Sequence, residues 1–450
     1  MTDMLAAHWQ PHARTTNRHQ GPMIYTHVRT FGALLASLSF LLVGMGLQNT
    51  LLGVRAGIEG FSTIETGLVM SGYFVGYLAG CWIAPRTIIR VGHIRTFSML
   101  ASLASGTAIL HAVEPAPWTW LALRIITGAS IAGLHLVVES WLNSATTRDQ
   151  RGGLLALYLV VNLGSIAAGQ QLLNAAEPAG FTLFALSSVL LSLAVVPVAL
   201  TRTQAPAPPT TPKLDLGRLY AVSPVALVGT AVSGLTNGAF WGMAPTYGQT
   251  IGLDAFRIAN FMTIVVIGGM VLQWPLGRLS DHMDRRIVLV AIAAALSALS
   301  AFLALVDPIA QRPLFLALSF LYGGCLLTLY SICNAHANDA SDAAASLEVA
   351  SGLLLVFGAG AMAGPLVASV AMSALGVEAL FELTAITAVS LALFGVWRLM
   401  VKAAPSAEQT SEFEPVPAGL ASPIPQDVDT LATGAMAASD NEETGPEQAI

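Results

Sequence analysis

The feature that most constrains this chain is a series of long apolar runs separated by short charged segments. A helix needs about 20 consecutive apolar residues to cross the hydrocarbon core of a bilayer. Twelve runs have about this length, at residues 30–54, 66–85, 96–113, 115–141, 152–176, 178–201, 219–250, 258–277, 287–306, 313–334, 347–374 and 378–400. A transmembrane β-barrel would instead show segments of about ten alternating residues. The sequence therefore predicts an all-α integral membrane protein with twelve transmembrane helices.

The composition supports a membrane protein and excludes several other classes. Of the 450 residues, 54% are hydrophobic and 10% are charged, whereas soluble domains carry roughly 25% charged residues. The net charge of −6 provides no basic face for a nucleic acid. Cys81, Cys325 and Cys333 do not have the spacing of a disulfide framework or of a cysteine metal site. We therefore expect a lipid bilayer around the protein, no nucleic-acid partner, no metal and no cofactor.

A proline-rich segment divides the chain into two parts. Residues 205–212 read APAPPTTP, which cannot form the interior of a helix. Basic turns at 90–95 and 281–286 lie about 190 residues apart, which indicates a weak internal repeat. Two related six-helix halves are an architecture of membrane transporters. The predicted organisation is an N-terminal segment 1–28, a six-helix bundle 29–201, a linker 202–218, a second six-helix bundle 219–400 and an acidic tail 401–450.

The placement of charges predicts the orientation in the membrane, because Lys and Arg collect on the cytoplasmic side. If the N-terminus is cytoplasmic, sixteen Lys and Arg fall in cytoplasmic segments and three on the opposite side, so both termini are predicted to be cytoplasmic. The loop 335–346 is an exception, since it has Asp339 and Asp342 but no Lys or Arg. The tail carries nine acids and one base and is predicted to be disordered. Residues 1–28 lack the apolar core of a signal peptide.

Three segments carry a family resemblance. Residues 277–286 read GRLSDHMDRR and resemble the loop signature of the major facilitator superfamily, G-x-L-x-D-R-x-G-R-R. Gly277, Asp281, Arg285 and Arg286 keep that pattern, and Asp284 replaces its second glycine. We expect Gly277 to permit a tight exit of the chain from the eighth helix, and Asp281 to cap the ninth helix or to accept an arginine. Residues 124–128, RIITG, resemble the R-x-x-x-G element of the family, and the stretch 123–173 is similar to its bacterial YcaD-like branch.

The resemblance implies two pseudo-symmetric six-helix bundles that work by alternating access. It implies a secondary transporter of the bacterial inner membrane, not an enzyme, with a small-molecule substrate and, we expect, coupling to protons and a monomeric state. Efflux is favoured over uptake. An uptake permease or uniporter for a neutral metabolite is an alternative, and so is a transporter-like receptor or scaffold that acts through its acidic tail.

Two charges in the fourth predicted helix need an explanation, because a charged side chain at the bilayer centre costs about 2.5–3.5 kcal/mol on insertion scales. Arg124 and Glu139 are fifteen residues apart on that helix, or about 22 Å at 1.5 Å per residue, so they cannot pair with each other. His135 lies one turn from Glu139 and could share a proton with it. One hypothesis is that Glu139 carries the coupling proton while Arg124 balances charge or holds an anionic substrate group. The other is that Glu139 latches a gate by pairing with Arg148 or Arg151.

The resemblance also implies a substrate cavity lined by the first, fourth, seventh and tenth helices. Polar side chains there can equally join one helix to another. Together they describe an amphipathic, aromatic pocket that suits a neutral or weakly charged organic solute better than a polyanion. The candidate cavity residues are Gln48, Asn49, Asn237, Trp241, Tyr247, Tyr322 and Tyr330.

Some acids and glycines have simpler roles. Ser62 to Glu65 reads as a capping box at a helix start, and Glu348 is expected in the first turn of the eleventh helix, where a carboxylate is favourable. Glycines at four-residue spacing in 72–80 and 360–364 let helices approach closely. They predict either static packing or a sliding contact between the second and eleventh helices.

Overall fold

The computed structural model describes residues 23–144, 148–200, 215–341 and 343–401, with side chains described outside 23–31, 143–152 and 343–347. Within these ranges the secondary structure is helical throughout, without a strand. The predicted segments 1–28, 202–218 and 401–450 lie largely outside them. The helices are α1 (Met23–Ile58), α2 (Thr63–Val91), α3 (His93–Val113), α4 (Pro117–Ser144), α5 (Arg148–Gln171), η1 (Leu172–Ala175), α6 (Thr182–Leu193), α7 (Val195–Ala199), α8 (Leu216–Val222), α9 (Pro224–Thr250), α10 (Ala255–His282), α11 (Arg285–Leu305), α12 (Arg312–Asp339), α13 (Ala343–Leu375) and α14 (Ala379–Val401).

The membrane spans agree with the twelve apolar runs. In the described ranges, eleven helices are long and apolar enough to cross a membrane, and a twelfth span is formed if the bent pair α8–α9 is taken as one. The axes of α8 and α9 differ by 117° at Ser223, which caps α9 through its side chain. Large apolar side chains such as Trp82, Val370 and Leu393 are exposed on the outer surface. A surface of this kind is stable only against lipid.

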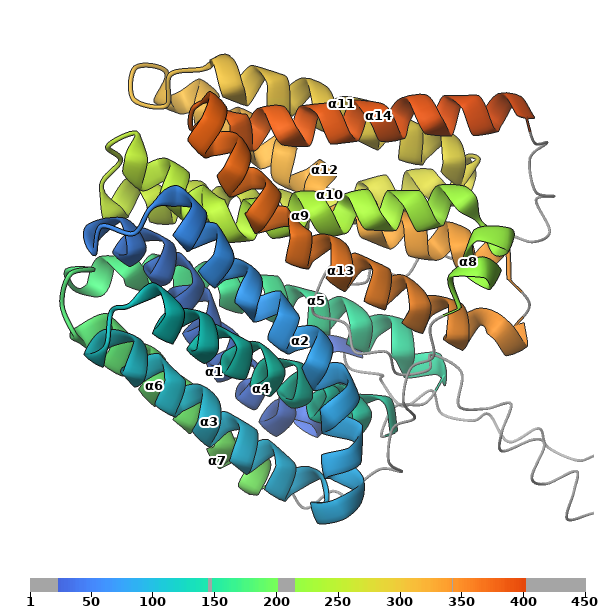
Figure 1. The fold of residues 1–450 in the computed structure, drawn as a ribbon. Helices are drawn as coiled ribbons and strands as arrows, with labels where there is room; N and C mark the ends of the chain where they lie inside the picture. Colours follow the sequence, from blue (N-terminus) through green and yellow to red (C-terminus); the bar gives the residue numbers. More distant parts are fainter. Residues whose placement is uncertain (1–22, 145–147, 201–214, 342, 402–450) are drawn as a thin grey trace, which may run out of the picture.

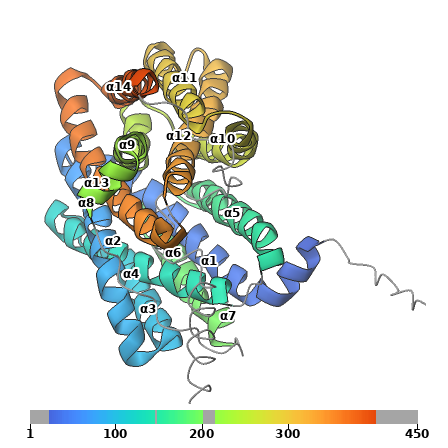
Figure 2. The same ribbon diagram turned by 90° about the vertical axis from the view of Figure 1, so that its right-hand side faces the viewer.

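The helices form two groups that follow the order of the chain. Helices α1 to α7 lie together in the lower part of Figure 1, and α8 to α14 lie in the upper part. Figure 2 shows the same division from the side, with α13 and α5 among the helices nearest the other group. The principal contacts between the groups join α2 with α13, α5 with α10 and α1 with α9. We call the two groups the N-half and the C-half.

The glycine stripes pack helices within each half and do not form the contact between α2 and α13. A Cβ on Gly76 would overlap the backbone of Ile125 in α4, and one on Gly364 would overlap the backbone of Leu235 in α9. The static-packing interpretation of these stripes is thus the one that the structure supports. The contact between α2 and α13 uses Gly67 against Ser369 at one end, and Leu78 against Gly358 near the middle of both helices.

The halves are joined mainly at one end of the molecule. We call this the closed end, defined by the turns at 59–62, 251–254 and 376–378, and we call the opposite end, where α1 begins and α14 ends, the termini end. The hydrogen bonds that join described residues of the two halves all lie near the closed end. Gln171 of α5 donates to Thr263 Oγ1 of α10 at 2.8 Å, and Thr246 of α9 donates to the carbonyl of Gly53 in α1 at 3.2 Å.

Candidate functional site

A cavity lies between the two halves, beyond the contacts of the closed end. It encloses about 880 Å³ of space free of atoms, including the part that opens outward. Its lining comes from α1, α2, α4 and α5 of the N-half and from α9, α10, α12 and α13 of the C-half. A bound molecule would therefore contact both halves at once.

Arg124 of α4 supplies the charge of the cavity. Its side chain is 3% exposed, and its Nη1 donates to Asn49 Oδ1 of α1 at 2.7 Å. The guanidinium carbon lies 4.5 Å from the ring centroid of Tyr73 in α2, at a distance suited to a cation–π contact. Arg124 Nε has no hydrogen-bond partner in the described part of the chain. The surroundings of this guanidinium are therefore polar and aromatic but not anionic.

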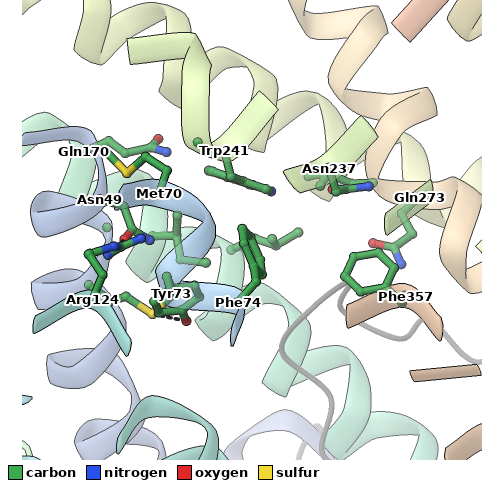
Figure 3. Close-up of a pocket in the computed structure, with 16 residues that line it drawn as sticks. Asn49, Met70, Tyr73, Phe74, Arg124, Gln170, Asn237, Trp241, Gln273 and Phe357 are labelled. Atoms are coloured by element: carbon green, nitrogen blue, oxygen red, sulfur yellow. Dashed lines mark hydrogen bonds between the residues drawn. The ribbon is translucent and has the colours of Figure 1, made fainter. Parts of the chain in front are cut away.

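The opposite side of the cavity is built from uncharged amides. Asn237 of α9 donates to the carbonyls of Ser233 at 2.9 Å and Leu326 at 3.3 Å, while its Oδ1 is buried without a described partner. Gln273 of α10 donates to Ser331 Oγ at 2.8 Å. Figure 3 shows these amides on the side away from Arg124. The cavity thus has a cationic end in the N-half and an amide end in the C-half.

Aromatic side chains fill the space between the two polar ends. Trp241 and Phe74 lie between Arg124 and Asn237 in Figure 3, and Phe357 lies near Gln273. Flat apolar surfaces of this kind bind planar rings well, because they bury a large area at a small cost in side-chain entropy. The arrangement can hold an elongated molecule with polar groups at both ends.

The cavity lining includes four residues that the sequence indicated, Asn49, Arg124, Asn237 and Trp241. Four other candidates from the sequence do not line the cavity. Tyr247 and Tyr322 pack against Phe381 in the core of the C-half, at ring-centroid distances of 5.1 and 5.9 Å. The remaining two, Tyr330 and Gln48, are buried away from the lining, with Tyr330 stacked edge-on against Phe357 and Gln48 1% exposed.

The structure adds cavity residues that the sequence did not identify. They lie mainly on α2, α5, α10 and α13, which the expectation of four lining helices omitted. Gln170 and Gln273, polar residues inside apolar spans, were the available signal for two of them. The apolar members carry no such signal. The principal additions are Met70, Tyr73, Phe74, Gln170, Gln273 and Phe357.

Glu139 and His135 lie toward the termini end of α4, outside the cavity lining. Glu139 is partly exposed, and its Oε1 accepts a hydrogen bond from the Tyr158 hydroxyl of α5 at 2.7 Å. His135 is fully buried. Its Nδ1 lies 3.0 Å from the carbonyl of Ile131, and its Nε2 has no described partner. The side chains of Arg148 and Arg151, the partners in the gate hypothesis, lie outside the described residues.

Comparison with known proteins points to one family of transporters. The sequence profile of the Major Facilitator Superfamily matches residues 226–437. YcaD from Escherichia coli (strain SMS-3-5 / SECEC), described as an uncharacterized MFS-type transporter, is 29% identical over 349 residues, covering 76% of this chain and 88% of that protein. The corresponding protein of Shigella dysenteriae serotype 1 (strain Sd197) matches equally well. In sequence and in fold, the chain is similar to the major facilitator superfamily.

Solved structures of two transporters share the fold. The nucleoside transporter NupG superposes with a TM-score of 0.67 at 13% identity, over 83% of this chain and 100% of that one. A bacterial homologue of the human lysosomal transporter Spinster, in an inward-facing and occupied conformation, gives 0.66 at 14% identity over 84% and 99%. These proteins are transporters and not enzymes.

The superfamily loop signature is held by buried ion pairs within the C-half. Arg285 is 1% exposed in its side chain, and its Nε lies 2.7 Å from Asp339 Oδ2 at the end of α12. Asp281 lies 3.4 Å from Arg285 Nη2, which fits its predicted role of accepting an arginine. The residue that caps α11 is Asp284, through a bond from the backbone N–H of Arg286. Asp284 thus caps the helix that follows the signature.

Two expectations about helix ends differ from the structure, and one is confirmed. Gly277 was expected at a tight exit, but α10 continues through it to His282 because the next residues keep helical backbone bonds. Glu348 lies beyond the first turn of α13 and pairs with Arg218 of α8. The capping box of Ser62 and Glu65 is present as predicted.

Proposed function

We propose that this chain is a secondary active transporter of the superfamily and that it carries a small organic solute across the bacterial inner membrane as a monomer. The observation that supports it best is a cavity shared by both halves and sealed by hydrogen bonds at the closed end. A site at the interface of two repeats, closed on one side, is what alternating access requires. The excess of Lys and Arg on one side favours cytoplasmic termini, so the termini end would face the cytoplasm.

We further propose that Glu139 carries the coupling proton. Its carboxylate lies near the termini end, hydrogen-bonded to Tyr158 and within electrostatic range of Tyr77 in α2 and Tyr330 in α12 of the C-half. A carboxylate in a membrane span whose surroundings include the other half can gain or lose a proton as the halves move. His135, one turn away, would tune this group.

The test measures solute flux driven by a pH gradient in proteoliposomes. Glu139→Gln is expected to leave exchange of solute intact. It should reduce the flux that depends on the pH gradient at least tenfold. Glu348→Gln, an acid-to-amide change in an exposed ion pair, is the matched control and should keep wild-type coupling. Unchanged coupling in Glu139→Gln would eliminate the proton role and favour the gate. Flux is recorded in both directions, which separates export, the direction favoured by the sequence, from uptake.

A reporter fused after residue 401 tests the orientation. A reporter that is active only in the cytoplasm should be active at this position, and an inactive reporter would contradict the proposed topology.

A further inference from the structure

We propose that the cavity selects organic monoanions, with one carboxylate or similar group bound at Arg124 and an aromatic or other planar body held between Trp241 and Phe74. The inference rests on the proposed function only for the passage of the ligand across the membrane. The binding itself can be measured without flux.

The charge of the cavity carries the argument. Of the sixteen described residues in the lining, Arg124 is the only charged one. Its partners, Asn49 and Tyr73, are neutral, and no carboxylate of the described chain lies within ion-pair distance of it. An arginine buried this deeply normally has an anionic partner. Here the free space of the cavity adjoins the guanidinium, so a ligand can supply the anion.

The donor geometry of Arg124 suits a carboxylate. A guanidinium has five N–H groups in a planar fork that matches the two oxygens of a carboxylate. Asn49 takes one of the Nη1 hydrogens, and Nε donates to no described residue. The remaining donors can bind an acidic group without breaking the contact to Asn49.

The far end of the cavity specifies the other part of the ligand. Asn237 Oδ1 is a buried acceptor without a described partner, so a ligand that brings a hydroxyl or N–H to this end of the cavity would pair with it. Because Arg124 belongs to the N-half and Asn237 to the C-half, a ligand that contacts both would connect the halves. The structure thus favours an acidic group at one end of the molecule and a hydrogen-bond donor at the other.

The same charge count disfavours other substrate classes. An organic cation would place a second positive charge beside Arg124 with no carboxylate in the lining to offset it. A phosphate ester or other polyanion would require more than one Arg or Lys. A single negative charge balances the single positive charge of the cavity.

The test uses three matched series of probes on purified full-length protein. Each series has one aromatic body, phenyl, indolyl or naphthyl, and three head groups: an arylacetate (anion), an arylacetamide (neutral) and an arylethylamine (cation). Dissociation constants are measured by calorimetry and thermal shift, since a ligand that binds the native state raises the apparent Tm. We expect at least one arylacetate to bind at least tenfold more tightly than its amide and amine. Equal or tighter binding of the amide or amine, or no binding of any arylacetate, would overturn the proposal.

Two variants assign the binding to Arg124. Arg124→Gln is expected to weaken arylacetate binding at least tenfold and to leave the amide within twofold of the wild type. Asn49→Asp places a carboxylate where the amide oxygen lies 2.7 Å from Nη1, and so supplies an internal anion. Asn49→Asp should weaken arylacetate binding by a similar factor while keeping the Tm of the wild type or raising it. This variant therefore tests the site even if Arg124→Gln does not fold. Arg257→Gln, on the exposed start of α10, is the control and should change nothing. Wild-type arylacetate affinity in both cavity variants would refute the site.

Flux measurements separate this inference from the proposed function. Transport of amides or amines with no preference for acids would keep the transporter and reject the anion site. Binding of arylacetates that depends on Arg124, without flux in either direction, would keep the anion site and reject transport of these compounds.

Discussion

At the scale of single residues, the buried pair of Arg285 and Asp339 explains an irregularity of the sequence. The loop 335–346 has acids where the positive-inside pattern predicts bases. In the structure Asp339 lies 2.7 Å from Arg285, with side-chain exposures of 3% and 1%. Asp339 therefore pairs with an arginine of the basic loop signature at 277–286. Such a partnership between residues 54 positions apart cannot be inferred from local spacing.

Removing one member of this pair should be costly. Asp339→Asn leaves a buried arginine with a weakened partner, and breaking buried pairs costs about 3–5 kcal/mol. We expect a loss of about 3 kcal/mol, measured as a lower Tm in detergent. Asp254→Asn removes the exposed pair with Arg257 but keeps an N-cap side chain, and it should cost less than about 1 kcal/mol. Equal losses in the two variants would contradict the difference in burial.

Acid should remove the contribution of Asp284. Partial burial raises the pKa of this carboxyl, but hydrogen bonds from the side chain and backbone N–H of Arg286 lower it more, so the pKa lies below its ordinary value. The group therefore stabilises the fold at pH values above the unfolded-state pKa of about 3.9, and this stability is lost as the pH falls through the folded-state pKa. Asp284→Asn should lower the Tm at pH 7, and the difference from the wild type should shrink below about pH 4. A difference that stays constant from pH 7 to pH 3 would argue against this ion pair.

The sequence identified the charged residue of the site better than its neutral neighbours. Arg124 stands out because a charge in an apolar span is unusual, and it does line the cavity. Tyr247 and Tyr322 are buried in the aromatic core, and Phe74 and Phe357 line the cavity. An aromatic side chain is compatible with both the packed core and the cavity lining. Its position depends on the rotation and tilt of each helix, which packing sets and composition does not.

At the scale of helices, apolar length predicted the spans well because the bilayer imposes one thickness on all of them. The helices run a few residues beyond the apolar runs at several ends, for example to His282 in α10 and Asp339 in α12. Charged residues continue these helices where they leave the hydrocarbon. Which helices the glycine stripes join could not be predicted, since each stripe specifies only that some neighbour approaches closely.

Glycine substitutions test the close contact of α2 and α4. Gly76→Ala places a methyl group on the backbone carbonyl of Ile125, and because backbone cannot move aside we expect a loss of at least about 2 kcal/mol in stability. Gly106→Ala in α3 meets nothing within 4 Å, so it should be neutral or stabilise by about 0.5–1 kcal/mol through helix propensity. Thermal denaturation monitored by fluorescence size-exclusion chromatography compares them. A tolerated Gly76→Ala would contradict the α2–α4 packing.

At the scale of the whole molecule, cross-linking tests whether the closed end must open during transport. Gln171→Cys with Thr263→Cys joins α5 to α10 across the halves, where the native side chains hydrogen-bond at 2.8 Å. Oxidation of this pair, in a background without the three native cysteines, should reduce flux at least tenfold, and reduction should restore it.

The matched control joins helices within one half. Thr107 and Thr127 hydrogen-bond at 2.8 Å between α3 and α4, so the pair Thr107→Cys with Thr127→Cys should cross-link without loss of flux. Full flux in the oxidised Gln171→Cys, Thr263→Cys protein would mean that the halves do not separate at this end.

The bonds that seal the closed end have a consequence for ionic strength. Between α5 and α10 they join the side chains of Gln170, Gln171, Asn260 and Thr263 and the backbone carbonyl of Ala167. Between α1 and α9 the Thr246 hydroxyl donates to the carbonyl of Gly53. Dissolved salt screens charge–charge attraction but has little effect on neutral hydrogen bonds. Opening of this end therefore exchanges neutral hydrogen bonds for bonds to water, and its equilibrium should be nearly the same in dilute and in concentrated electrolyte.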